Sequence, residues 1–370
     1  MPADFQLTLS DASLNKIAVQ IFPAVGPKLQ QTESLPDQQL TLSWAITSPP
    51  VFAFTGQDGP QTFRMNLALT VTVTPDGKPP ESAPATAVAL VKTAIDGTGT
   101  LSLRVSSMVF NSSDAFLAAV LNARQADVAN QVNGLLASIS PTLGIVDDIA
   151  FHGFAVDVAA GVLGMAASIN GNASNDSMTP PATDYSLLVG QALVQTLVQQ
   201  QWWNTVPKSY GADGANITLN SYNVVVAGGQ ILLTFMLSGT YSIGAADWDV
   251  RISPVTARLN VSVDANRNVK ISSAGTSTPD VSLSPSNWLA YVFDIGLSLV
   301  AAITEAIISD VIGDKISGSI NSQLDQTLLQ VPVLSGGFDG VTITLTPDSL
   351  AVGGAGNQLL ITGNGIASAS

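Results

Sequence analysis

Hydrophobic and polar residues alternate along several stretches of this chain, and the alternation predicts β-strands that bury one face. Across residues 67–74 the odd positions are Leu or Val and the even positions are Ala or Thr. Residues 101–106 and 255–263 alternate in the same way. The polar run 264–268 is followed by Val269 and Ile271, so this part of the chain is predicted to form a hairpin.

An amphipathic helix is predicted early in each half of the chain, at Ser10–Phe22 and at Tyr185–Trp203. In each half an antiparallel strand region follows, then a second, longer helix, and then a closing pair of strands. This order of elements predicts an α+β fold.

The second helix of the first half begins after the N-cap sequence Asn-Ser-Ser-Asp at 111–114 and ends before Pro141. Its positions at helical spacing are predominantly apolar. The apolar face comprises Leu117, Val120, Leu121, Val128, Val132, Leu135, Leu136 and Ile139.

The second helix of the second half follows Ser284 and Pro285, a cap with proline at the first helical position. It runs over Trp288–Ile312, where the polar residues form one narrow stripe and the rest of the helix surface is apolar. A helix of this kind is surrounded on most sides by other parts of the protein. At 1.5 Å per residue it would be about 37 Å long, enough to lie along a whole curved sheet.

Similar segments recur in the same order in the two halves, about 170 to 190 residues apart, which indicates one supersecondary plan used twice. The hexapeptide 116–121 corresponds to 288–293. The segment 151–158 corresponds to 338–345.

Residues 170–181 have the composition of a linker and lie near the midpoint of the chain. We therefore predict two tandem modules, residues 1–170 and 182–370. Each module is expected to be a highly curved antiparallel sheet wrapped around a long apolar helix.

The composition is unusual for a soluble protein, because only 11% of the residues are charged, against about 25% on average, while 46% are hydrophobic. Membrane spans, long sheets buried on both faces, or an enclosed apolar cavity would each accommodate so little charge. A span needs about 18 nearly uninterrupted apolar residues, and the best candidate, 288–312, is interrupted by Asp294, Glu305 and Asp310. No transmembrane segment is predicted.

The formal net charge of −14 and the isoelectric point near 4.1 argue against nucleic acid and anionic membrane surfaces as partners, since both require a basic face. The absence of cysteine excludes disulfides and thiolate metal sites. The first six residues lack the basic and apolar regions of a secretory signal. We expect a cytoplasmic protein, with export by a route other than the Sec pathway left open.

A curved sheet on a long apolar helix, used twice in tandem, resembles the tubular lipid-binding (TULIP) superfamily. That superfamily includes the bactericidal/permeability-increasing protein family, lipid-transfer modules at membrane contact sites and accessory proteins of clostridial toxin clusters. The segment 316–332, ISGSINSQLDQTLLQVP, is similar to the end of the family's long helix, where an Ile-Asn-x-x-Leu run passes through Val-Pro into the closing strands. The resemblance covers almost the whole chain.

Departures from the family pattern restrict what the resemblance implies. The secreted bactericidal branch has a signal peptide, a disulfide and a basic tip, and this chain has none of these. Binding of lipopolysaccharide is therefore not expected. The resemblance is nearest to the cytosolic bacterial branch that contains the toxin-cluster accessory proteins.

The residues offer little for catalysis. His152 is the only histidine, so any Ser-His-Asp device would have to use it, and a polar position at a strand edge explains it without catalysis. No G-x-S-x-G motif is present, and one histidine without cysteine leaves no usual zinc site. We predict that the protein is not an enzyme and uses no metal or cofactor. Trp202 and Trp203 either gate a pocket mouth or plug the end of the second module.

Other motifs imitate ligand loops but lack residues that those loops require. The spacing at 264–268 is EF-hand-like, but Gly275 stands where a bidentate Glu is needed, so a hairpin turn is the better interpretation. The glycine-rich runs 353–356 and 363–365 are not followed by a predicted helix, as a phosphate loop would be.

These observations favour non-catalytic binding or carriage of a lipid or another long apolar ligand in a cavity between helix and sheet. Burial of apolar surface supplies about 25 cal/mol per Å², so an acyl chain needs no specific polar contacts. The residues expected to line the cavity are Leu117, Val120, Leu121, Val128, Leu135, Leu289, Val292, Leu299, Ile303 and Ile307.

The alternative is a scaffold or accessory interaction protein of a secreted or toxin-linked complex, with the same fold and filled cores. The dense apolar surface of 288–312 favours this alternative, because it leaves little room for a ligand. A continuous internal hollow would support the carrier, and a fully packed interior would support an interaction protein whose partner is another protein.

Overall fold

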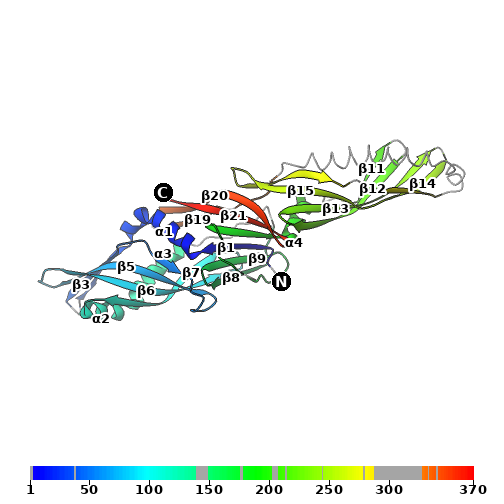
Figure 1. Cartoon of the computed structure of the whole chain (residues 1–370). Helices are drawn as coiled ribbons and strands as arrows, with labels where there is room; N and C mark the ends of the chain where they lie inside the picture. Colours follow the sequence, from blue (N-terminus) through cyan, green and yellow to red (C-terminus); the bar gives the residue numbers. More distant parts are fainter. Residues whose placement is uncertain are drawn as a thin grey trace. The chain divides into compact units, whose positions relative to one another are not determined.

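Antiparallel strands make up most of the structure (Figure 1). It is a computed structural model that describes residues 3–36, 39–138, 149–175, 178–201, 207–212, 215–243, 245–277, 280–286, 327–331, 333–338 and 341–370. The predicted α+β class is confirmed in part. The fold is mostly β, with strongly curled antiparallel sheets, and among the described residues the longest helix has 15 residues.

The chain forms two compact units. Unit 1 comprises residues 1–188, 331–351 and 361–370, and unit 2 comprises 189–330 and 352–360. The predicted modules were defined by repeated sequence, which is a different criterion, so their boundary at 170–182 stays a prediction.

Unit 1 begins with β1 (Phe5–Ser10), α1 (Asp11–Val25) and the short 3₁₀ helix η1 (Gly26–Lys28). One curled sheet follows, with strand order β2-β3-β5-β6-β7 and β4 paired to β5. Its strands are β2 (Gln30–Leu35), β3 (Leu40–Ile46), β4 (Val51–Ala53), β5 (Thr62–Pro75), β6 (Glu81–Ile95) and β7 (Leu101–Ser112).

The predicted alternation is confirmed in β5. Leu67, Leu69, Val71 and Val73 are each at most 4% exposed, while the residues between them are half-buried or exposed. Because consecutive side chains of a strand point to opposite faces, this pattern places the core on one face of the sheet.

A second sheet has the strand order β19-β20-β21-β10-β1-β9-β8. Its other strands are β8 (Gly153–Ala159), β9 (Val162–Ser168), β10 (Tyr185–Gly190), β19 (Leu334–Phe338), β20 (Val341–Ala355) and β21 (Gln358–Ala369). The predicted closing pair of strands is therefore found in both halves, as β8–β9 and β20–β21.

The helix predicted at Ser10–Phe22 is confirmed as α1. Ser10 caps it by accepting a hydrogen bond from the Ser13 N–H at 3.0 Å. The helix predicted at Tyr185–Trp203 begins later, at Gln191, because 185–190 form a strand. That strand, β10, lies beside β1, and the Thr8 and Ser186 hydroxyl oxygens are 2.6 Å apart.

The second helix of the first half is interrupted, contrary to the prediction. It consists of α2 (Ala115–Ala123) and α3 (Gln125–Ser138), with Arg124 between them at φ −107° and ψ 11°. Asp114 caps α2 as predicted, accepting from the Phe116 and Leu117 N–H groups. Both helices pack against β7, whose pairing with β6 contains a register shift. A strand bends at such a register shift, and the break at Arg124 lets the helical segment follow the bend.

Asparagine side chains of these helices satisfy the backbone at strand edges. Asn133 of α3 accepts from the Val105 N–H at 2.6 Å and donates to the Val105 carbonyl at 3.4 Å. Asn122 of α2 makes the same pair of bonds to Phe110, both at 3.0 Å. Among the described strands β7 is the last of its sheet, so the two amides take the place of a neighbouring strand.

Unit 2 contains α4 (Gln191–Gln201) and a sheet with strand order β11-β12-β13-β15-β16-β18, in which β14 pairs with β13 and β17. The strands are β11 (Lys208–Ala212), β12 (Ala215–Ala227), β13 (Gln230–Ile243), β14 (Ala246–Ile252), β15 (Val255–Val263), β16 (Asn268–Thr276), β17 (Val281–Pro285) and β18 (Thr327–Gln330). The predicted hairpin around 264–268 is confirmed by the pairing of β15 with β16.

The long apolar helix predicted at Trp288–Ile312 lies outside the described residues. No helix within the described part of the chain is long and apolar enough to cross a membrane.

We expect Asn133→Ala to lower the free energy of unfolding by about 1–3 kcal/mol, because it leaves the Val105 N–H without its acceptor. Asn130→Ala, an exposed asparagine on the same helix, is the matched control and should change stability by less than about 0.5 kcal/mol. Urea unfolding of both variants measures the difference. Equal effects would contradict the structural role assigned to Asn133.

Candidate apolar ligand cavity

A hollow of about 250 Å³ lies between α1 and the sheets within unit 1. The helix contributes residues at the spacing i, i+3, i+4, so one apolar face of α1 covers the hollow. This face comprises Leu14, Ile17, Ala18, Ile21, Phe22 and Val25.

The opposite walls come from strands and from the end of α3. Strand β5 contributes alternate residues of its buried face, and β7, β9 and β20 contribute further pairs. These lining residues are Phe63, Met65, Leu67, Leu101, Leu103, Leu163, Met165, Ile343 and Leu345, together with Val132 and Leu136 of α3. Other parts of the wall are Leu9, Leu29, Ile46, Pro50 and Phe52.

Every described residue that lines the hollow is apolar. Water inside it would lack the two or more polar partners that a buried water needs. None of the described lining residues has a titratable side chain, so this part of the wall offers no group for acid–base chemistry. The arrangement is suited to holding an apolar chain.

Polar contacts on both flanks of α1 hold its apolar face over the hollow. On one flank, Asn15 accepts from the Phe52 N–H at 2.6 Å and donates to the Phe52 carbonyl at 3.0 Å. Among the described residues β4 pairs only with β5, so this amide satisfies its other edge.

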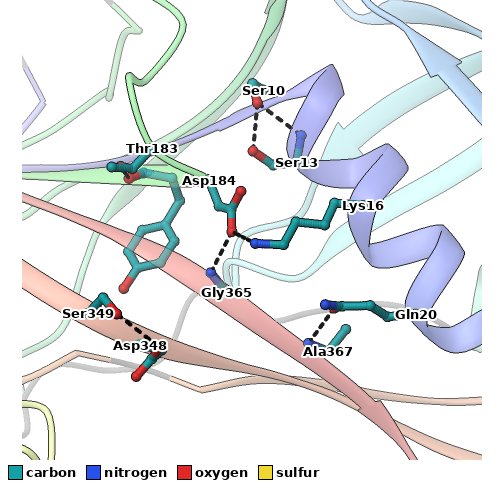
Figure 2. Close-up of polar contacts among 11 residues, drawn as sticks. Ser10, Ser13, Lys16, Gln20, Thr183, Asp184, Asp348, Ser349, Gly365 and Ala367 are labelled. Carbon is teal, nitrogen blue, oxygen red and sulfur yellow. Dashed lines mark hydrogen bonds and ion pairs between the residues drawn. The ribbon is translucent and has the colours of Figure 1, made fainter.

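Figure 2 shows the contacts of the other flank. Lys16 forms an ion pair with Asp184 at 2.5 Å, and Asp184 also accepts from the Gly365 N–H at 2.9 Å. One helical turn further on, Gln20 accepts from the Ala367 N–H at 2.9 Å. The helix is thus attached to β4 on one side and to β21 on the other.

The predicted lining residues of the first half lie elsewhere in unit 1. Leu117, Leu121 and Val128 are buried and Val120 is half-buried on α2 and α3, but none of these four lines the hollow. The side chain of Leu135 lies outside the description.

The predicted lining residues of the second half, Leu289, Val292, Leu299, Ile303 and Ile307, lie outside the described residues. All ten residues therefore stay a prediction. The α1 residues and strand residues that line the hollow were not among the predicted lining residues, although the apolar periodicity of α1 is visible in the sequence. The sequence does not show which part of the protein the apolar face of α1 covers.

The other residues considered for chemistry lie in ordinary strand or turn surroundings. His152 is exposed, and its backbone N–H donates to the Ser168 carbonyl at 2.8 Å. Asp264 lies in the β15–β16 turn, where the Asn268 N–H and the Asn266 N–H donate to its carboxylate. The hydrogen bond from the Asn268 N–H is the main cause that holds the pKa of Asp264 below its ordinary value.

In the described part of the chain no group of three or more His, Cys, Asp or Glu residues could hold a metal ion. Trp202 and Trp203 lie outside that part.

Three solved structures resemble the chain over nearly its whole length. P47 of Clostridium botulinum E1 superposes with a TM-score of 0.55 at 11% identity, covering 98% of each chain. P47 from Clostridium botulinum A2 gives 0.52 at 12% identity, covering 98% of this chain and 97% of that one. The lipopolysaccharide binding protein gives 0.45 at 11% identity, covering 99% of each chain.

No protein-family model matches the chain, and no curated protein sequence matches it. At identities of 11% and 12% the two P47 structures show the fold alone. The resemblance predicted from the sequence is thereby confirmed at the level of the fold.

Proposed function

We propose that this protein binds and carries an apolar ligand with a single long chain, such as a fatty acid, in the cavity against α1. The observation that supports the proposal is a hollow of about 250 Å³ whose described lining residues are all apolar. An empty apolar hollow destabilises a protein in proportion to its volume, by about 24 cal/mol per Å³ in measured core truncations. A chain that fills it would recover part of that free energy.

The size of the hollow favours one chain over two. Pockets for small molecules typically measure about 300–1,000 Å³, and this hollow lies just below that range. A second acyl chain would not fit beside the first. The ligand class is therefore a lipid or other molecule with one long apolar chain.

The alternative function, an interaction protein with filled cores, predicts a packed interior. The hollow in unit 1 counts against filled packing there. The P47 likeness supports the fold and does not distinguish the two functions.

We expect Ala18→Phe to reduce binding of a fluorescent fatty acid by at least about tenfold, because the new ring occupies the hollow. Ala12→Phe is the matched control, since Ala12 is an exposed alanine on the same helix. Fluorescence titration and native mass spectrometry measure both. Binding that is equal in the two variants would place the ligand elsewhere, and no binding by the unaltered protein would refute carriage.

We propose that α1 moves when a ligand enters; the Lys16–Asp184 ion pair is its most exposed attachment, with 45% of the Lys16 side chain exposed. We expect Asp184→Asn to raise the dissociation rate of a bound fatty acid about 1.4- to 5-fold. That range corresponds to the 0.2–1 kcal/mol of a partly exposed ion pair. The asparagine oxygen can still accept from the Gly365 N–H, so only the ion pair is removed.

Asp348→Asn is the control for this variant, because Asp348 is an exposed carboxylate of β20 bonded to the neighbouring Ser349 (Figure 2). Stopped-flow displacement by unlabelled fatty acid measures the rates. Identical rates for both variants would mean that the ion pair does not hold α1 closed.

A further inference from the structure

A second, smaller hollow of about 20 Å³ lies within unit 1 against β1, β10 and β20. Its described lining residues are apolar apart from the Tyr185 hydroxyl, and include Leu7 of β1, Leu187 of β10 and Pro347 of β20. It holds too little space for a ligand of its own. It is relevant because it adjoins the main cavity.

Leu9 and Leu345 line both hollows. Their side chains therefore stand between the two spaces. Leu9 is 5% exposed and lies on β1, which is flanked by β10 and β9. Leu345 of β20 is only half-buried, so of the two it is the less constrained.

Two glycines of β21 explain why Leu345 can occupy this position. The odd positions of β21 from Leu359 to Ala367 are buried, and Gly363 and Gly365 interrupt them with no side chain. A Cβ atom at position 365 would lie 2.6 Å from the Leu345 Cδ1. A Cβ at position 363 would lie 2.8 Å from the Tyr185 hydroxyl. The glycines thus leave room for Leu345 and Tyr185 to lean across β21.

We infer that Leu345 sets the maximum length of the chain that the cavity accepts. This inference rests on the proposed function and adds a determinant of specificity to it. A chain that runs along the main cavity stops at the Leu9–Leu345 partition, and the small hollow beyond would take its end if the partition were opened. Affinity should therefore rise by about fourfold per methylene, from about 0.8 kcal/mol each, until the chain reaches Leu345.

The test uses the full chain with Leu345→Ala, Leu345→Val and Leu345→Phe. Leu→Ala removes about three carbon atoms of side chain, which opens the partition into the second hollow. Leu350→Ala is the matched control, because it is the same substitution on the same strand and Leu350 lines neither hollow. Each protein is titrated with saturated fatty acids from lauric to behenic acid, and native mass spectrometry identifies the bound species.

We expect Leu345→Ala to raise the longest tightly bound chain by about two to four carbon atoms, and Leu345→Val by fewer. Leu345→Phe should bind no longer a chain than the unaltered protein, and Leu350→Ala should keep the original limit. Circular dichroism and thermal unfolding confirm that each variant is folded, and Leu345→Val carries the test if the alanine variant is not.

These measurements distinguish failure of the role of Leu345 from failure of the carrier function. Fatty-acid binding with the same length limit in all folded variants would overturn the role of Leu345 and leave the carrier function standing. Absence of binding by the unaltered protein would overturn the carrier function and the inference with it.

Discussion

The structure of unit 1 depends on one constraint, that the backbone groups at the edge of a sheet must find hydrogen-bond partners. Side chains from helices meet it at several places. Asn15, Asn122 and Asn133 each bond both the N–H and the carbonyl of one residue on an edge strand, as a neighbouring strand would. Gln20 also accepts from a backbone N–H near the end of β21, although this strand lies inside its sheet. These bonds fix where the helices lie against the sheets.

This manner of attachment has a consequence for packing. The flanks of α1 are held by Asn15, Lys16 and Gln20, so its position over the sheets does not rely on interdigitation of its apolar face alone. A helix held in that way can cover a hollow without collapsing into it. The cavity, the proposed ligand and the partition at Leu345 all follow from the space that remains under α1.

The sequence predicted features that depend on local order. The alternation in β5, the cap at Asp114 and the hairpin after β15 are recognisable because strand faces, caps and turns are set by residues close together in the chain. The strand at 185–190 was mistaken for helix, since its pairing partner β1 lies about 180 residues away. The break at Arg124 was missed because it follows the irregular course of β7.

The cavity could be predicted only as a possibility of the fold. The periodicity of α1 reveals an apolar face but not what lies opposite, and that depends on contacts such as the one between Gln20 and Ala367, 347 positions apart. Gly363 and Gly365 leave space for Tyr185 and Leu345. Nothing in the sequence pattern around these glycines would assign them this role. The residues predicted from the sequence to line a cavity lie on α2, α3 and 288–312 and stay a prediction, whereas α1 and the strands that face it line the hollow of unit 1.

Photo-crosslinking with a fatty acid that carries a diazirine near the end of its chain tests the central claim most directly. After irradiation and digestion, the labelled peptides locate the bound chain. We predict label on α1 and on the strands that face it, β5, β7, β9 and β20. Label confined to α2, where Leu117 and Leu121 are buried, or spread over surface peptides, would contradict it.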